Sequence, residues 1–94
     1  MKINGIIWLE EVEDKIFQKH KVTTEDVEEI LMSKPRFRFI EKGYQRDENI
    51  YAALGQSKKG KYLIIFFIYK LTNEALIISA RQMTKRERKT YAKK

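Results

Sequence analysis

The sequence contains no cysteine and only one histidine and one proline in 94 residues. The absence of cysteine excludes disulfide bonds, zinc–thiolate sites and thiol nucleophiles, and it fits the reducing cytoplasm, where we expect the protein to act. The one histidine, His20, has no second histidine at metal-ligand spacing, so we expect no metal and no cofactor. We interpret His20 as a packing residue or as a residue at a helix end, where the helix dipole favours a cation.

Long apolar runs are also absent. The longest, Tyr62–Tyr69, has eight residues, whereas a membrane-spanning helix needs about twenty. No apolar stretch of a signal peptide occurs near the N-terminus. We therefore expect a soluble, untargeted protein without a membrane partner. A hydrophobic content of 43% is enough for a core, and the length suits one domain over residues 1–94.

Charge is distributed unevenly along the chain. Residues 1–33 contain eight acidic and four basic side chains, whereas residues 79–94 contain seven basic side chains and one acidic one. This separation predicts a basic face for a polyanion and an acidic element set apart from it. A solvated surface that serves only solubility is the alternative, and the net charge of +7 is compatible with both.

The N-terminal third predicts a short strand followed by two helices. Residues 6–9 are a short apolar run, and apolar residues then recur at helical spacing through residues 9–20. A second helix begins after Thr23, which is suited to an N-cap, and ends before Pro35.

From residue 36 the hydrophobic period changes from helical spacing to two. Strands are predicted at residues 36–40, 49–57, 62–70 and 75–80. The turns between them are short, so neighbouring strands must be antiparallel. A short C-terminal helix from Lys85 to about Ala92 follows, because Thr84 and Glu87 form the T-x-x-E pattern of a capping box. The predicted fold class is α+β, with two N-terminal helices, a four-stranded antiparallel meander and a C-terminal helix.

Cations gather where the last strand meets this helix. Lys85 and Arg86 lie in the first turn, where the helix dipole disfavours them. Exposed backbone N–H groups and cations at a helix start form a site for phosphate, and we interpret the placement as functional. Arg81, at the end of the last strand, can bind a phosphate through two parallel hydrogen bonds. A salt bridge from Arg81 to an acid on the first two helices is the alternative.

Further candidates lie in the hairpin and on tyrosines. Lys58, Lys59 and Lys61 surround the turn before the third meander strand, and Lys61 is the most firmly placed of them. Tyr91 lies on the same helix face as Glu87, where its phenol can pack, stack on a base or donate a proton. Tyr44 lies in a polar loop and can stack on an unpaired base.

Taken together, these motifs resemble the BrnT family, which are small ribonuclease toxins of bacterial type II toxin–antitoxin pairs with a RelE-like fold. The resemblance runs from Trp8 to Tyr91, and its most specific part is the "ISAR…T-x-R-E-R…Y" pattern of residues 78–91. It implies RNA cleavage without a metal and neutralisation by a ribbon-helix-helix antitoxin in a heteromeric complex. The family's functional positions fall on His20, Lys61, Arg81, Thr84, Arg86, Glu87, Arg88 and Tyr91.

The sequence departs from the family pattern at several positions. Lys21 replaces a glycine after the family's histidine, and Gln56 stands where an arginine is usual. Another common arginine is absent from the stretch "ENIYAAL". Two fewer cations predict a weak or specialised ribonuclease.

The resulting hypothesis is a metal-independent endoribonuclease that inhibits translation by cleaving mRNA, free or bound to the ribosome. Arg81 and Lys61 stabilise the charge on the phosphoryl oxygens, and Tyr91 donates a proton to the departing 5′-oxygen. Glu87 is the nearby acid that can serve as base, but its place in the capping box favours the role of a cap, which leaves the base to water or unassigned. RNA binding is assigned to Lys58, Lys59, Lys85, Arg86, Arg88 and Tyr44.

Two other classes of function use the same residues. A non-catalytic RNA-binding protein needs the same basic face without the chemistry. A protein-interaction domain would instead dock its basic C-terminal helix on an acidic partner. Salt dependence distinguishes RNA binding from the latter, because phosphate contacts release counterions and weaken steeply with ionic strength.

Overall fold

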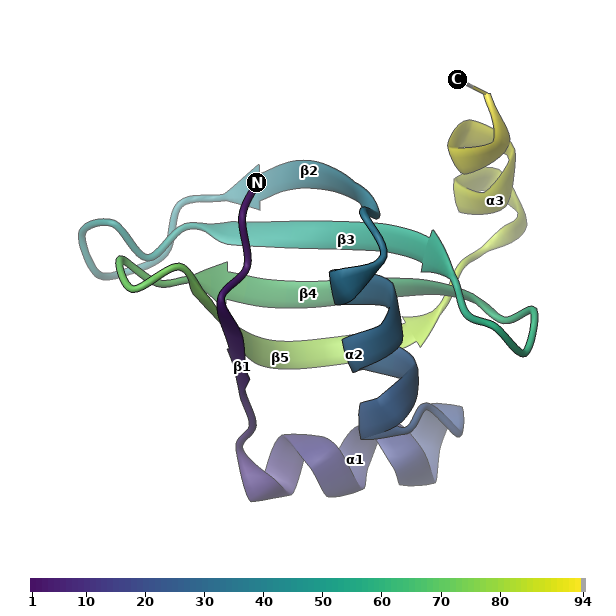
Figure 1. Cartoon of the computed structure of the whole chain (residues 1–94), viewed down its shortest axis with the longest axis horizontal. Coiled ribbons are helices and arrows are strands. Elements are labelled where there is room, and N and C mark those ends of the chain that lie inside the picture. Colours follow the sequence, from purple (N-terminus) through teal and green to yellow (C-terminus); the bar gives the residue numbers. More distant parts are fainter. Residues whose placement is uncertain (94) are drawn as a thin grey trace.

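One five-stranded sheet and three helices make up residues 1–93, the part of the chain that the structure, a computed structural model, describes (Figure 1). The elements follow the chain in the order β1 (Gly5–Ile7), α1 (Glu10–His20), α2 (Thr24–Met32), β2 (Arg36–Glu41), β3 (Ile50–Gln56), β4 (Tyr62–Tyr69), β5 (Glu74–Gln82) and α3 (Lys85–Ala92). The α+β class and the order of elements are those predicted from the sequence. None of the helices in residues 1–93 is long and apolar enough to cross a bilayer.

The sheet has the strand order β1-β5-β4-β3-β2. Strands β2 to β5 form the predicted antiparallel meander. The short N-terminal strand differs from the prediction in its bounds and joins the far edge, where Gly5 and Ile7 pair in parallel with Glu74 and Leu76 of β5. The sheet is therefore mixed rather than fully antiparallel, because β1 pairs in parallel with β5.

Local signals account for the helix boundaries. The Oγ1 of Thr23 accepts a hydrogen bond from the backbone N–H of Asp26, and the Asp26 carboxylate accepts one from the N–H of Thr23, both at 3.1 Å. This capping box starts α2. Helix α1 has three acidic residues in its first turn and Lys19 and His20 in its last, as the helix dipole favours. His20 thus lies at a helix end, as predicted.

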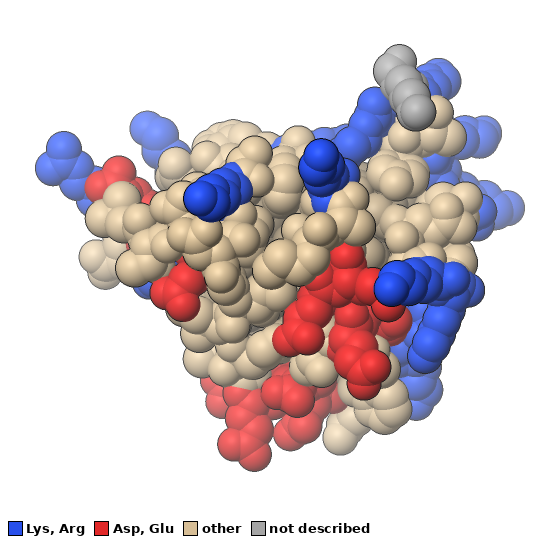
Figure 2. Space-filling model, in the orientation of Figure 1, with Lys and Arg blue, Asp and Glu red and all other residues tan. Residues whose placement is uncertain are grey.

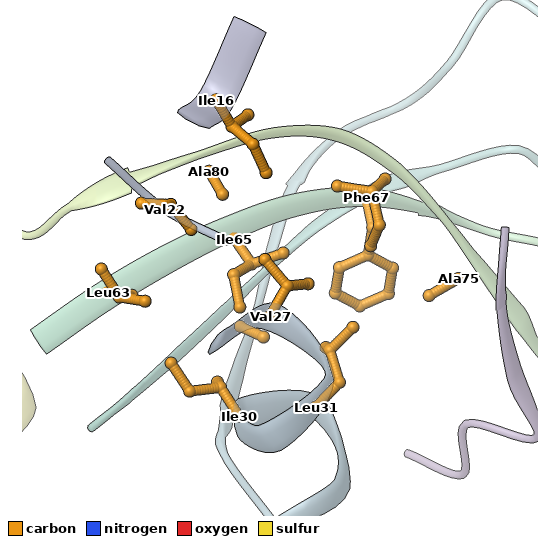
Figure 3. Close-up of a cluster of buried hydrophobic side chains, with 12 residues drawn as sticks. Ile16, Val22, Val27, Ile30, Leu31, Leu63, Ile65, Phe67, Ala75 and Ala80 are labelled. Carbon is orange, nitrogen blue, oxygen red and sulfur yellow. The ribbon is translucent and has the colours of Figure 1, made fainter. Parts of the chain in front are cut away.

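Helix α2 crosses one face of the sheet and α1 lies beside β5, and the main hydrophobic core lies between these two helices and the sheet (Figures 1 and 3). Its buried members come from both helices and from alternate positions of the strands, and they include Ile16, Val27, Ile30, Leu31, Ala53, Leu63, Ile65, Phe67, Ile77 and Ala80. Gly55 of β3 lets α2 approach closely, because a Cβ atom there would lie only 2.9 Å from Cγ2 of Ile30. This contact explains the glycine in the "ALG" stretch.

The opposite face of the sheet, which we call the α3 face, carries a second and smaller apolar cluster. Its buried members are Ala52, Leu54, Ile64 and Met83, with Tyr62, Phe66 and Tyr91 packed against them. Figure 1 shows α3 at the end of the sheet where β5 finishes and β2 begins. Helix α3 itself contains no buried residue. It is a polar helix that lies against the rim of this face, and its position brings the cationic tail to the sheet.

Candidate nucleic-acid interface

A row of side chains crosses the α3 face and has an arginine at each end. The row consists of directly paired residues on four neighbouring strands, in the order Arg36, Leu54, Ile64 and Arg81. Directly paired residues point to the same face of a sheet, and neighbouring strands lie about 4.8 Å apart, so the two arginine Cα atoms are roughly 14 Å apart. The row is therefore an apolar strip with a guanidinium at each end.

Arg81 is held at its end of the row by the terminal helix. Its two terminal nitrogens donate to the two carboxylate oxygens of Glu87 at 2.7 and 3.0 Å, and Nη1 also donates to the carbonyl of Gln82 at 3.1 Å. The guanidinium carbon lies 5.5 Å from the centroid of the Phe66 ring. The sequence left open a salt bridge to an acid on the first two helices. The structure shows one, but its acid is on α3.

Glu87 is both the cap of α3 and the partner of Arg81. The Oγ1 of Thr84 accepts from the N–H of Glu87 at 3.1 Å, and the N–H of Thr84 donates to Glu87 at 2.8 Å, which confirms the predicted capping box. The hydrogen bonds from Arg81, together with the backbone N–H of Thr84, lower the pKa of Glu87 to about 2 despite its partial burial. A carboxylate of this kind holds protons poorly at neutral pH, so its geometry favours the capping role over that of a general base.

Lys61 lies on the other face of the sheet from Arg81. Its Nζ donates to the backbone carbonyl of Lys21 at 3.0 Å and to the carboxylate of Asp26 at 3.2 Å. Burial raises the pKa of Asp26, but hydrogen bonds from Thr23 and Lys61 outweigh it and leave the pKa below its usual value. The structure therefore does not bring Lys61 and Arg81 to one phosphate. Lys61 instead links the start of β4 to the junction of α1 and α2 through these two hydrogen bonds.

The hairpin lysines and Tyr44 lie at opposite ends of the sheet. Lys58 and Lys59 are exposed in the β3–β4 turn, which is at the same end as Arg81 because Leu63, soon after this turn, pairs with Gln82. The backbone N–H of Lys58 donates to Glu29 at 2.7 Å. Tyr44 is fully exposed in the β2–β3 connection at the other end. The end of the sheet that carries Arg36, Arg81 and α3 is the cationic end. The hairpin can thus extend this end, whereas Tyr44 is separate from it.

Tyr91 of α3 packs against the apolar cluster of the α3 face. Its ring meets that of Tyr62 edge to face, with centroids 6.2 Å apart. Together with Arg36, Phe37, Arg38 and Leu54 it lines a hollow of about 290 Å³. The side chain is half-buried, so packing accounts for part of its role, and the hollow leaves space beside it.

Arg36 and Arg38 were not among the residues that sequence reasoning selected. The Nη1 of Arg36 donates to the carbonyls of Thr90 and Tyr91 at 3.0 and 3.2 Å, near the C-terminus of α3. Arg38 lies two residues further along β2 and lines the same hollow. The alternation in "RFRFI" placed both arginines on one face of a strand, but nothing in the sequence showed that this face is the one that carries Arg81.

The cations of α3 are exposed to solvent. Lys85, Arg86 and Arg88 of the predicted RNA-binding set are all exposed, and the guanidinium of Arg88 lies over the ring of Tyr62. Figure 2 shows acidic side chains gathered over α1 and α2 and a group of basic ones along the end of the molecule that carries α3. Lys94, the last cation of the tail, lies outside the described residues. Among residues 1–93, no three or more His, Asp or Glu side chains come together as a metal site.

Comparisons with known proteins give the family of this chain. The family described as ribonuclease toxin, BrnT, of type II toxin–antitoxin systems matches residues 8–87. No curated protein is significantly similar. The 1.1 Å crystal structure of the Brucella abortus ribonuclease toxin BrnT is similar with a TM-score of 0.59, over 86% of this chain and 97% of that chain, and at 20% identity it shows a shared fold. The chain belongs to the BrnT family of ribonuclease toxins of type II toxin–antitoxin systems.

Proposed function

We propose that this chain cleaves RNA at the α3 face, with Arg81 as the residue that binds the scissile phosphate. The observation that supports this most directly is the apolar strip that ends in Arg36 and Arg81. An RNA strand carries its negative charge on the phosphates, and its bases can contact an apolar protein surface. A strip with a guanidinium at each end suits such a strand, because the guanidinium groups bind phosphates while the strip contacts a base.

The contacts of Arg81 leave it able to bind a ligand. A guanidinium has five N–H donors, and in residues 1–93 three of these donate to Glu87 and Gln82. Two donors therefore remain for a phosphate oxygen. The carboxylate fixes the plane of the guanidinium in advance, so little conformational entropy is lost when the phosphate binds.

Metal-independent cleavage requires charge stabilisation, alignment of the 2′-hydroxyl and a proton for the leaving 5′-oxygen. In this proposal Arg81 stabilises the charge on the phosphoryl oxygens, and Arg36 and Arg38 position the strand. Tyr91 lines the same hollow as these two arginines and is the proton donor. The proton acceptor is water, because the low pKa of Glu87 makes it a weak base.

The biological consequence follows from the family. A type II toxin has an antitoxin partner and an RNA substrate. We infer that cleavage of mRNA, in the cytoplasm and on the ribosome or off it, inhibits translation, and that a ribbon-helix-helix antitoxin neutralises the enzyme by covering the α3 face. Antitoxin and RNA then exclude one another. A gel-shift experiment that shows both bound to one toxin molecule would contradict this part of the proposal.

Arg81→Ala tests the catalytic assignment. Loss of charge stabilisation by one such group lowers the rate about 100-fold or more. The matched control is Arg46→Ala, which removes an exposed arginine from the β2–β3 connection at the other end of the sheet. We expect the wild type and the control to degrade RNA to products with 2′,3′-cyclic phosphate ends, and Arg81→Ala to leave it intact. Equal degradation and equal growth arrest by all three proteins would refute the assignment.

The product analysis also distinguishes the second candidate function. Retained binding of RNA by the wild-type protein without any cyclic phosphate product would indicate a non-catalytic RNA-binding protein. The low pKa of Glu87 is the observation in favour of that alternative, because it takes away the carboxylate nearest to Arg81 as a general base.

A further inference from the structure

Arg88 lies over the ring of Tyr62, and no side-chain carboxylate in residues 1–93 forms an ion pair with it. The guanidinium carbon is 4.1 Å from the centroid of the ring, within the range of a cation–π contact. In residues 1–93 no hydrogen bond or ion pair joins the Arg88 guanidinium to another group of the protein, and the neighbouring Glu87 carboxylate is already engaged by Arg81 and Thr84. The guanidinium is therefore positioned by an aromatic surface, and its donors face solvent.

Tyr62 is itself fixed. It is the first residue of β4 and pairs with Gln56 of β3. The ring of Tyr91 meets it edge to face at 75°. Because the sheet and Tyr91 hold the ring, Arg88 rests on a rigid support. A flat cation held on a rigid ring can receive a second flat group on its outer side.

A hollow of about 330 Å³ opens beside this pair. It is lined by Tyr62, Lys85, Arg88, Lys89 and Ala92. The three cations stand at positions i, i+3 and i+4, so they share one face of α3 and repel one another. No acid on α3 offsets them, because its one acid, Glu87, is bonded to Arg81. Solubility alone requires neither an aromatic ring under Arg88 nor a hollow beside it. The stacked ring and guanidinium indicate a flat ligand, and the three cations indicate an anionic one.

We propose that Tyr62 and Arg88, flanked by Lys85 and Lys89, form a subsite for one unpaired nucleobase and the phosphates next to it. The base stacks on the outer side of the Arg88 guanidinium, and the lysines bind the adjoining phosphates. This inference rests on the proposed function and defines its substrate as single-stranded RNA. In a duplex both faces of each base are covered by its neighbours, so the subsite cannot be filled.

One RNA strand can occupy both the subsite and the position beside the catalytic arginine, Arg81. Glu87 bonds to Arg81, and Arg88 is the next residue of α3. Neighbouring nucleotides of a single strand can therefore occupy the two positions together. The subsite selects RNA that is unpaired beside the cleaved bond, and it does so through a base-stacking surface that tolerates any base.

Binding of a 2′-O-methyl oligonucleotide tests the proposal without cleavage, because this RNA lacks the nucleophilic hydroxyl. The variant is Arg88→Lys, which keeps the charge but loses the flat cation. The same substitution at the exposed Arg46, at the other end of the sheet, is the control. The measurements are the affinity for the single strand and for its duplex, the salt dependence of each, and the quenching of 2-aminopurine placed in turn at each position of the single strand.

We expect the wild type and Arg46→Lys to prefer the single strand and to quench 2-aminopurine at one position more than at the others. Arg88→Lys should bind the single strand about fivefold to tenfold more weakly and lose that quenching, since stacking of one base contributes on this scale. Its salt dependence should stay as in the wild type because the number of charges is unchanged. Tyr62→Phe keeps the ring and should behave as the wild type, whereas Tyr62→Leu should resemble Arg88→Lys.

Failure of the subsite and failure of the proposed function give different results. A wild type that binds RNA but neither prefers the single strand nor quenches 2-aminopurine at one position overturns the subsite alone. The same holds if Arg88→Lys retains both properties. A wild type that binds none of these RNAs overturns the proposed function as well. Circular dichroism of each variant confirms that the fold is retained, and Arg88→Lys changes an exposed residue, so its result does not depend on Tyr62.

Discussion

Glu87 accepts two hydrogen bonds from Arg81, at 2.7 and 3.0 Å, while it also caps the helix on which it lies. The last strand and the terminal helix are therefore joined through one carboxylate. The ion pair fixes the direction of the Arg81 guanidinium and, at the same time, the start of α3. Anything that protonates or removes Glu87 loosens both.

This relationship predicts a dependence of stability on pH. The pKa of Glu87 is about 2 in the folded chain, against an ordinary value of 4.5. A lowered folded-state pKa means that the carboxylate stabilises the fold fully above about pH 4.5 and loses this effect as the pH falls toward 2. Glu87→Gln should therefore lower the free energy of unfolding by about 1–3 kcal/mol at pH 7 and by clearly less at pH 3.

Urea unfolding at the two pH values measures this difference. Glu41→Gln is the matched control, because Glu41 is exposed on β2. We expect the control to resemble the wild type at both values. A deficit of Glu87→Gln that is the same at pH 7 and pH 3 would show that the ion pair with Arg81 is not its cause.

Lys61 gives a second prediction, because its role in the structure is to neutralise Asp26, which is 3% exposed. Lys61→Met would leave that carboxylate with only the hydrogen bonds of the helix cap. Loss of a partner from a buried ion pair costs several kcal/mol, and the partial exposure of Lys61 reduces this to about 1–3 kcal/mol. Asp26→Asn in the same chain should recover part of the loss, since the amide oxygen still caps α2.

Thermal unfolding and RNA cleavage, measured together, distinguish this role from a catalytic one. We expect Lys61→Met to unfold at a lower temperature while the folded fraction cleaves RNA at the wild-type rate. An unchanged melting temperature with lost cleavage would restore Lys61 to the catalytic residues that the sequence suggested.

Lys21 gives a third prediction. It follows the last residue of α1 with φ of 56°, in the left-handed region that glycine adopts most easily. Among the described residues, the lysine side chain offers in return only a cation–π contact with Phe17 at 5.6 Å. Lys21→Gly should therefore raise the free energy of unfolding by about 0.5–1 kcal/mol. Lys21→Ala retains the backbone strain and should give no gain, and a gain equal to that of glycine would mean that the backbone is not strained.

Gly55 gives a fourth prediction, this time a loss. A methyl group at this position would lie 2.9 Å from Cγ2 of Ile30, and forcing extra volume into a packed core costs about 1–3 kcal/mol. Gly5→Ala is the control, because the nearest atoms to its added methyl group lie at 3.6 Å, an ordinary contact. Chemical denaturation should show a large loss for Gly55→Ala and little change for Gly5→Ala. Similar losses in both would indicate a general intolerance of strands to this exchange.

Much of the fold could be predicted because its signals are local. Thr23 and Thr84 each start a helix with a partner three residues away, and both caps are present. The alternation of apolar and polar residues after Pro35 is also a short-range signal, and it indicates a strand. The pairing of β1 with β5 joins residues almost 70 positions apart, and nothing in a short window of sequence reports on such a contact.

The candidate site was less accessible to sequence reasoning for a related reason. Strand β4 is apolar on both faces and shows no alternation of apolar and polar residues. Its sequence therefore could not show on which face of the sheet Lys61 lies. Its placement opposite Arg81 depends on the register between strands. Arg36 and Arg38 were visible as one face of a strand, but the meander had to be assembled before that face could be matched with Arg81.

The position of β5 in the chain also determines when the cationic residues of the α3 face can come together during synthesis. Strand β1 emerges first from the ribosome, but its neighbour β5 emerges after every other strand. Because β5 carries Arg81 and leads into α3, a nascent chain has no assembled cationic site until its last strand is free to pair.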